Sequence, residues 1–248
     1  MSLFTDDQLY RRGAATLRAS WEAYAQASSG AAVHTHPGLA ASAFPSEPER
    51  SVYNNALLER DLAEAERTAA IDAMEAVYAV AGVDRFAAWA HETDVAMRSD
   101  LERRGYVLDT STLAMGMALD GLRGTRPHLD LVDVQWTDYL RTFNLPDALL
   151  ATADHAAFHL IVARLDGEAA GAALAFDHAG DTGIFNVETL ERHRRCGLGT
   201  ALTAYQAHDA LARGCRTASL QSTAIGEGVY AAVGFRDLGR YFEYVPKR

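Results

Sequence analysis

The segment Val187–Thr200, with the sequence VETLERHRRCGLGT, constrains this chain more than any other. It begins with residues typical of a strand and ends with residues typical of the start of a helix. Arg194, Gly197 and Gly199 form the pattern R-x-x-G-x-G. Glycine lets the backbone come close to a ligand and turn several N–H groups towards it. The predicted helix, from about Thr200 to Arg213, would direct the positive end of its dipole at the same point. These features together suit a pyrophosphate.

The flanks of this segment add the specificity that a short glycine loop lacks. The loop has no third glycine at the position that a dinucleotide-binding fingerprint requires. Upstream, Ile184–Leu190 reads as a strand. Downstream, Thr217–Ser222 reads as another strand, and Ile225–Val233 as a short helix that carries Tyr230 and ends at Gly234-Phe235. The sequence therefore predicts a strand, a glycine loop, a helix, a strand and a short helix in succession.

This order resembles the acyl-CoA site of the GNAT superfamily of N-acetyltransferases over about residues 129 to 248. The resemblance rests on R-x-x-G-x-G after one strand and Y-x-x-x-G-F after the next. It implies acetyl-CoA as co-substrate and direct transfer of the acetyl group to an amine. It also implies that backbone N–H groups of Val187, Glu188 and Thr189 polarise the thioester carbonyl, where their strand leaves its neighbour. The pyrophosphate would be held by the loop residues Arg194, Arg195, Cys196, Gly197, Leu198, Gly199 and Thr200.

Two side chains are the candidates for proton transfer. Tyr230 matches the family's general acid, which protonates the leaving thiolate; alternatively, it is an aromatic residue that packs on the sheet. An alkylammonium has a pKa of roughly 10, so the acceptor must lose a proton before it reacts. Glu188 is the candidate base, directly or through water, and the alternative is an ordinary surface or salt-bridged glutamate. Glu227 is a weaker candidate. We assign no catalytic role to Cys196.

Composition limits the possible partners. The formal net charge of −10 argues against a nucleic-acid partner and is compatible with a cationic small-molecule amine as acceptor. With two cysteines and no basic segment before an apolar run at the N-terminus, we predict a cytoplasmic protein without a disulfide framework. No apolar stretch is long enough to span a membrane. His34 and His36 lack further ligands at metal spacing, so we expect no metal. The oligomeric state stays open.

The first half of the chain has its own series of predicted elements. Thr5-Asp6-Asp7-Gln8 is a capping box before an amphipathic helix. We predict a loop over His34–Arg50, a helix over Asp61–Ala81, a helix over Asp94–Arg104 and two strands between Gly105 and Met117. Two further strands are expected over Ser51–Leu58 and Arg85–His91.

The two halves of the chain look like copies. Aligning Gly105-Tyr106 with Gly234-Phe235 gives an offset of 234 − 105 = 129 residues. Each pair follows a short helix, a strand and a longer helix that ends in glycine. We therefore predict the mixed α+β class with two GNAT-like units, each a mostly antiparallel sheet flanked by helices. Residues 1–125 would be a degenerate, structural domain and residues 126–248 the domain with the acetyl-CoA site.

The predicted degenerate copy lacks the features of the phosphate loop. Its equivalent, Glu59–Arg67, has no glycine and carries four acids against two arginines, a net charge of −2. Acids at a helix start would repel a phosphate. The counterpart of Tyr230 is 230 − 129 = 101, which is Leu101.

Three functions fit these observations. The first is an N-acetyltransferase that acts on a small amine. The second is a non-catalytic acyl-CoA-binding or sensing module, which would not need Tyr230 as a proton donor. The third is a protein lysine or N-terminal acetyltransferase. The sequence does not select the acceptor or the acyl chain length.

Overall fold

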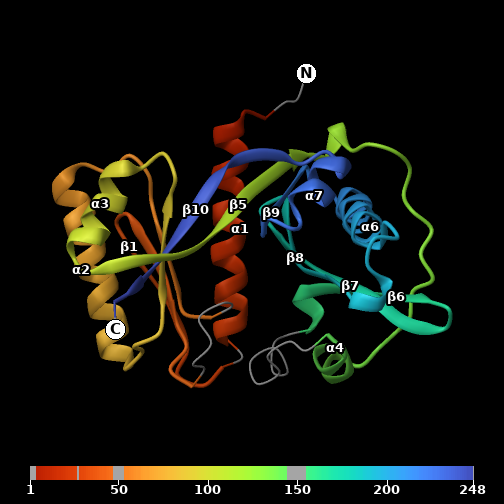
Figure 1. Cartoon of the computed structure of the whole chain (residues 1–248), viewed down its shortest axis with the longest axis horizontal. Helices are drawn as coiled ribbons and strands as arrows, with labels where there is room; N and C mark the ends of the chain where they lie inside the picture. Colours follow the sequence, from red (N-terminus) through yellow and green to blue (C-terminus); the bar gives the residue numbers. More distant parts are fainter. Residues whose placement is uncertain (1–3, 27, 47–52, 144–154, 248) are drawn as a thin grey trace. The chain divides into compact units, whose positions relative to one another are not determined.

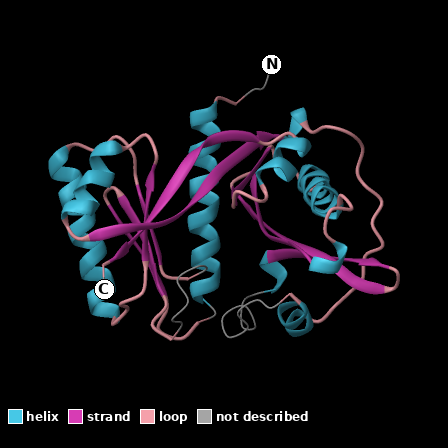
Figure 2. Ribbon diagram, viewed as in Figure 1, coloured by secondary structure: helices cyan, strands magenta, loops and turns pink. Residues whose placement is uncertain are grey.

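The computed structural model describes residues 4–26, 28–46, 53–143 and 155–247. Its elements form a mixed sheet flanked by helices (Figures 1 and 2). The chain groups into two compact units, each made of two segments. The unit that contains the glycine loop, here the motif unit, is Met1–Ser20 with Leu113–Leu238, and the companion unit is Trp21–Thr112 with Gly239–Arg248. This division differs from the predicted one at residue 125, because the first helix and the two long strands each contribute to both units.

The motif unit is built on the strand order β5-β9-β8-β7-β6. All neighbours in it are antiparallel except β8 and β9, which are parallel. Helix α6 lies on one face of β6 to β8 and helix α4 on the other (Figure 1). The elements are α1 (Asp6–Gln26), β5 (Tyr106–Ala118), α4 (Trp136–Thr142), β6 (Phe158–Leu165), β7 (Glu168–His178), β8 (Asp181–Thr189), α6 (Leu198–Ala212), β9 (Thr217–Ser222), α7 (Glu227–Val233) and β10 (Arg236–Pro246). Short 3₁₀ turns cover Leu119–Gly121, His155–Ala157 and Glu191–His193.

The companion unit has the strand order β1-β2-β3-β4-β10, with only β3 and β4 parallel. Its core lies between these strands and helices α2 and α3, and it includes the stacked rings of Tyr78 and Phe86. The remaining elements are β1 (Ala32–His36), β2 (Leu39–Ala43), β3 (Asn55–Leu58), α2 (Glu64–Ala81), β4 (Ala87–His91) and α3 (Val95–Arg103).

Several local predictions are confirmed. The Thr5 backbone N–H donates to Gln8 Oε1 (2.9 Å), and the Gln8 N–H donates to Thr5 Oγ1 (3.2 Å), which is the reciprocal geometry of a capping box. Helix α2 ends at Gly82 with φ 68°. The sequence predicts strands over His159–Leu165 and Glu168–Phe176 joined by a turn at Asp166-Gly167. The β6–β7 hairpin has that turn, with Asp166 at φ 53° and Gly167 at φ 84°.

The loop predicted over His34–Arg50 is wrong over residues 34–36 and Leu39–Ala43, which are strand residues. Strands β1 and β2 form a hairpin there, and Gly38 makes its turn with φ 78°. Pro37 and Gly38 thus connect two strands, whereas the prediction used them to exclude strands. Strand β2 is fully buried but consists of Leu, Ala and Ser, so its sequence lacks the β-branched residues that mark a strand. Residues 47–52, which include Arg50 and the start of the predicted strand Ser51–Leu58, lie outside the described part.

The predicted pair of strands before Met117 is one continuous strand, β5. Two apolar helix faces predicted from the sequence differ in part from the structure. In α2 the predicted face of Ala69, Ala70, Ala73, Met74, Val77 and Val80 is buried at Ala70, Met74 and Val77, but Val80 is exposed and Ile71 and Tyr78 are buried instead. In α6 the predicted core residue Leu211 is 46% exposed, and the buried face instead includes Leu202, Ala207 and Gln206. The Gln206 amide donates to the carbonyls of His159 and Ala173, so a polar side chain occupies a position that a hydrophobicity pattern excludes.

A buried carboxylate joins helix α1 to strands β8 and β9. Asp181 is 2% exposed and accepts hydrogen bonds from Thr16 Oγ1 (2.7 Å), Thr217 Oγ1 (2.5 Å) and Ser219 Oγ (2.7 Å). Burial raises the pKa of Asp181, and the three hydroxyl donors oppose that rise. The first helix of the chain is therefore part of the motif unit through a polar contact as well as through apolar packing.

We predict that Thr16→Val lowers the free energy of unfolding by about 1–3 kcal/mol, because a buried carboxylate loses a donor. Urea unfolding at pH 7 measures this loss. Burial raises the folded-state pKa of Asp181, so the carboxyl is protonated to a greater extent at pH 4 than at pH 7 and then depends less on a donor that favours its ionised form. The loss of stability caused by Thr16→Val should therefore be smaller at pH 4. Thr68→Val, the same change at an exposed helical position, is the control. Equal stability of the two variants would contradict the assigned role.

Candidate active site

The glycine loop, residues 190–199, connects β8 to α6 and includes the first residues of that helix; it is called the phosphate loop below, after the role predicted for it. Strand β8 ends at Thr189, a 3₁₀ turn covers Glu191–His193, and α6 begins at Leu198. Gly197 is the N-cap with φ 83°, and Arg195 has φ 64°. A positive φ at the cap needs glycine, since a side chain would be strained there. The first N–H groups of α6 have no partner within their own helix, which makes the start of α6 suitable for an anion.

Gly199 leaves open space at the start of α6. A Cβ atom built on it would lie 3.6 Å from Val229 Cγ1 and 3.8 Å from Thr189 Oγ1, which are ordinary contact distances. The protein itself therefore does not require glycine at this position. A glycine that the packing does not need is consistent with close approach by a ligand.

Strand β8 separates from β9 after three residue pairs. Asp181, Thr182 and Gly183 pair with Thr217, Ala218 and Ser219, and no pairing of the two strands follows among the described residues. The predicted separation of this strand from its neighbour is thus present. The gap opens into a cavity of about 550 Å³. Its lining comes from β8, the phosphate loop, the start of α6 and the β9–α7 connection with α7: Val187, Glu188, Thr189, His193, Arg194, Arg195, Gly197, Leu198, Gly199, Thr200, Thr223, Ile225, Gly226, Val229 and Tyr230.

A β-bulge in β8 decides where its side chains point. The pairing of β7 with β8 shifts between Leu174–Phe185 and Ala172–Glu188, so one residue of β7 faces two of β8. Asn186, one of the two, has φ 49°. The extra residue reverses the alternation of faces beyond it.

The faces can be followed from the contacts on either side of the bulge. Before it, Gly183 and Phe185 face α1, since a Cβ on Gly183 would lie 3.0 Å from Thr16 Cγ2. Strict alternation would put Val187 on that same face. Val187 instead packs in the cluster of Leu198 and Leu202 on the α6 face. The bulge therefore places Glu188 on the face opposite α6, which is the face that α4 covers (Figure 1).

Tyr230 lines the cavity and is held by packing. Its ring meets Phe235 edge to face at 6.3 Å, and it lies over Gly226, where a Cβ would be 2.8 Å from the ring. Burial, with a further contribution from the charge of Glu188, raises the pKa of Tyr230 to about 12. The phenol is therefore protonated at neutral pH and can act as a proton donor.

Glu188 is paired with an arginine of the phosphate loop. Arg194 Nη2 lies 3.2 Å from Glu188 Oε1, and Arg194 Nε donates to the Thr189 carbonyl at 3.1 Å. Both side chains are partly exposed, at 58% for Arg194 and 41% for Glu188. Arg194 of the loop thus contacts two neighbouring residues of strand β8, Glu188 and Thr189.

The structure brings nearly all predicted site residues together around one cavity. Cys196 is the exception: it is exposed, its thiol donates to the His193 carbonyl at 2.9 Å, and it does not line the cavity. Five further lining residues were not predicted, because their contribution depends on how two loops meet: His193, Thr223, Ile225, Gly226 and Val229. Glu227, the weaker candidate base, is also absent from the lining.

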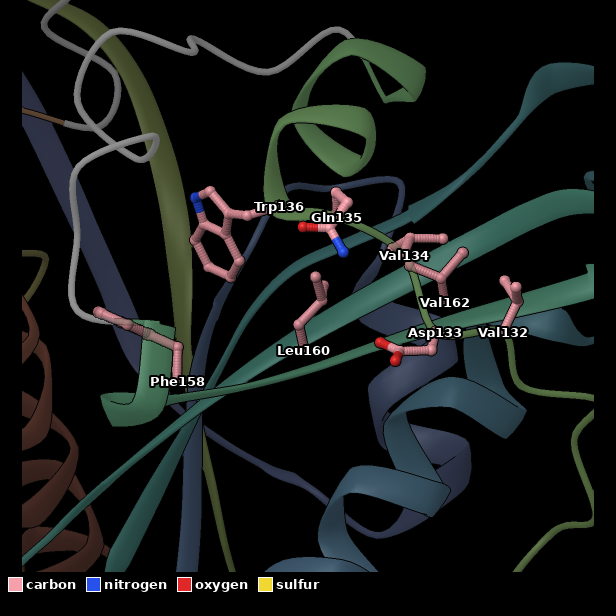
Figure 3. A pocket seen from close by; sticks show the side chains of 8 residues that line it. All are labelled: Val132, Asp133, Val134, Gln135, Trp136, Phe158, Leu160 and Val162. Carbon is pink, nitrogen blue, oxygen red and sulfur yellow. The ribbon is translucent and has the colours of Figure 1, made fainter.

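A second cavity, of about 250 Å³, lies between β6 and the segment before α4 (Figure 3). It contains none of the predicted site residues. Its lining is Val132, Asp133, Val134, Gln135, Trp136, Phe158, Leu160 and Val162.

The site offers donors for an anionic cofactor, and no metal ligand set accompanies it. Backbone N–H groups, Arg194, Arg195 and His193 converge at one end of the larger cavity, which fits the charge of a pyrophosphate. Among the described residues, no three His, Cys, Asp or Glu side chains are grouped so as to hold a metal ion. In that same part of the chain, no helix has the length and apolar character needed to cross a membrane.

Comparisons with known proteins agree with this geometry. Residues 128–235 match the model of the acetyltransferase (GNAT) family. A GCN5-related N-acetyltransferase from Kribbella flavida is similar in structure, with 17% identity, a TM-score of 0.71 and coverage of 95% of this chain and 96% of that one. Another from Sphaerobacter thermophilus has 15% identity, a TM-score of 0.57 and coverage of 85% and 81%.

A tandem GNAT protein from the clavulanic acid biosynthesis pathway has 14% identity, a TM-score of 0.58 and coverage of 88% and 83%. No curated protein sequence matches the chain. Identities this low indicate the fold alone, whereas the family model matches the sequence of the site itself. The chain therefore has the fold of the GNAT acetyltransferases, and residues 128–235 carry the match to that family.

Proposed function

We propose that this protein transfers an acetyl group from acetyl-CoA to the amine of a small molecule. One observation carries the proposal: the phosphate loop, the separated strand, a protonated tyrosine and a carboxylate all line the same cavity. A site that only bound phosphate would not need the last two groups. The small-molecule acceptor is favoured by the partly enclosed cavity and the net charge of −10, both of which suit a cation.

Each group has a distinct role in the proposed reaction. Acetyl-CoA, when bound, would supply the acetyl thioester. The start of α6, with Arg194 and Arg195, would hold its pyrophosphate. Glu188 would accept a proton from the acceptor nitrogen, so that a nitrogen–carbon bond can form as the carbon–sulfur bond breaks. Tyr230 would give its proton to the departing sulfur. Backbone N–H groups of β8 would stabilise the charge on the carbonyl oxygen.

Two alternatives remain distinct from this proposal. A non-catalytic acyl-CoA sensor would bind the cofactor equally well, but a raised tyrosine pKa beside a carboxylate would have no role in it. A protein acetyltransferase would use the same chemistry on lysine-rich or N-terminal segments. Thiol release from acetyl-CoA, measured against small amines and against peptides, separates the three functions.

We also propose that the chain is a tandem duplication whose companion unit has a structural role. The order α2, β4, α3, β5 in the first half repeats as α6, β9, α7, β10 in the second. Each half has one parallel strand pair, β3–β4 and β8–β9. The last strands are exchanged, since β10 pairs with β4 and β5 pairs with β9. The description of one similar structure as a tandem GNAT protein supports this proposal.

The position equivalent to the phosphate loop is filled by the companion unit's own side chains. The Glu66 carboxylate accepts from the Ala63 N–H at the start of α2 (2.8 Å), where a phosphate would otherwise bind. Arg67 donates to the Leu62 carbonyl (2.9 Å) and to Asp100 (2.7 Å), so it is already paired. Leu101, at the position equivalent to Tyr230, is fully buried.

Gly199 allows a test of the proposed CoA site. Gly199→Val should abolish measurable binding of CoA, because the side chain would occupy the approach to the start of α6 while the protein has room for its Cβ. Isothermal calorimetry measures the affinity. Gly228→Val, at an exposed glycine of the neighbouring helix α7 with no atoms near its Cβ position, should bind normally. Undiminished affinity in a folded Gly199→Val protein would count against the assignment.

The second prediction concerns proton transfer. Tyr230→Phe should keep CoA affinity and reduce kcat by roughly a hundred- to ten-thousand-fold, the usual range for a general acid. Rapid-mixing experiments establish whether chemistry limits turnover. An unchanged rate of the chemical step would return Tyr230 to a packing role.

The third prediction concerns stoichiometry. Calorimetric titration of the full chain should give one CoA per chain, because the equivalent loop of the companion unit is closed by Glu66 and Arg67. Two molecules per chain would show that the companion unit keeps a cofactor site.

A further inference from the structure

Tyr139 places a buried hydroxyl beside the candidate site without a hydrogen bond of normal geometry. The residue lies on α4 and is 1% exposed, and its hydroxyl oxygen has no hydrogen-bond partner among the described residues. A buried polar group without a partner costs about 1–3 kcal/mol and needs an explanation.

Two polar residues of β8 act on this hydroxyl. Burial is the main cause that raises the pKa of Tyr139. The Asn186 side chain opposes the rise because it lies close enough to act as a hydrogen-bonding group, although not in normal geometry, and the charge of Glu188 adds to the rise. Both residues belong to the bulged part of β8, and the bulge is what directs Glu188 to the face that α4 covers. The tyrosine hydroxyl and the carboxylate therefore approach the same space from α4 and from β8.

The tyrosine ring is fixed, whereas the carboxylate can move. Tyr139 packs between Trp136, at 5.6 Å, and Phe143, at 5.7 Å. Trp136 is itself fixed against Phe158 of β6, at 6.3 Å (Figure 3). Glu188, in contrast, has a side chain that is 41% exposed, and in the described part of the chain one of its oxygens accepts from Arg194. Any new contact between the two would require Glu188 to turn, not Tyr139.

The present partner of Glu188 is a cation that the cofactor would compete for. Arg194 is the arginine of R-x-x-G-x-G, and under the proposed function it binds pyrophosphate. A partly exposed ion pair is worth only about 0.2–1 kcal/mol, so a pyrophosphate can readily displace the carboxylate. A carboxylate left in a partly buried site then needs another donor.

We propose that Tyr139 is a positioning residue, whose hydroxyl takes over the Glu188 carboxylate from Arg194 when the cofactor binds. Before binding, the carboxylate is paired with the Arg194 guanidinium. After binding, the Glu188 carboxylate would accept a hydrogen bond from the neutral Tyr139 hydroxyl, on the face of β8 that α4 covers. The exchange would prepare the base only when the cofactor is present. This inference rests on the proposed function of the same cavity.

The test is a double-mutant cycle in CoA affinity, measured by calorimetry on the full chain. The four proteins are the parent, Tyr139→Phe, Glu188→Ala and the double variant. Tyr139→Phe should weaken CoA binding about threefold or more, because the displaced carboxylate finds no donor. In the Glu188→Ala background, Tyr139→Phe should not change CoA affinity, because the carboxylate that would accept the Tyr139 hydrogen bond is absent. Tyr205→Phe, on α6 and outside the cavity lining, is the matched control and should bind as the parent does.

A kinetic measurement separates positioning from packing. Tyr139→Phe should lower kcat more than it raises the KM of the amine. It should also move the acid limb of the kcat profile to higher pH, because the carboxylate loses a donor that favours its ionised form. The thermal midpoint should not fall, since the variant removes a hydroxyl for which the described residues offer no hydrogen bond of normal geometry.

The outcomes are distinct. Equal effects of Tyr139→Phe in both backgrounds, or no effect on affinity and on the acid limb, would overturn the inference while leaving the acetyltransferase proposal intact. Failure of the parent protein to bind CoA would overturn both. If Tyr139→Phe does not fold, Tyr139→Met can replace it in the cycle, because Met is also apolar and adapts to irregular core space.

Discussion

The separation of β8 from β9 is the constraint on which the site depends. Three residue pairs hold the two parallel strands together, and beyond Gly183 and Ser219 they part. The backbone groups of β8 that would have bonded to β9 become available to a ligand. The gap admits α7 with Tyr230 on one side and the phosphate loop on the other. A regular sheet at this position would have closed the cavity.

The point where the strands part is stabilised by a buried polar cluster. Asp181 and its three hydroxyl donors join β8, β9 and α1 within the three residue pairs that precede this point. A buried carboxylate is stable there because each donor offsets part of its desolvation. Helix α1, which begins the chain, thereby supports a site formed more than a hundred residues later in the sequence.

The bulge at Asn186 gives the site two chemically different faces. Val187 and Thr189 face α6, towards the side that carries the phosphate loop. Glu188 faces α4, where Tyr139 lies. Cofactor binding and proton acceptance can therefore be assigned to opposite faces of the same short strand segment. A strand without the bulge would point Glu188 at the apolar core beside α6.

The local parts of the site could be predicted from the amino-acid sequence. The glycine loop, the helix that follows it and the helix with Tyr230 are recognisable because each depends on neighbouring residues: a cap that needs positive φ, a helix start and a fixed spacing to Gly234-Phe235. The capping box at Thr5 and the turn at Asp166-Gly167 were predictable for the same reason.

Only the tertiary structure decided the features that depend on distant segments. The face of Glu188 follows from register with β7, and the burial of Gln206 follows from carbonyls on β6 and β7. The hairpin of β1 and β2 consists of small residues whose strand character comes from pairing with neighbours. The sequence does not indicate that the Tyr139 hydroxyl lies near Asn186 and Glu188, because these residues are about fifty positions later in the chain. Strand pairing and packing between distant segments set these features, and neither is encoded in a local pattern.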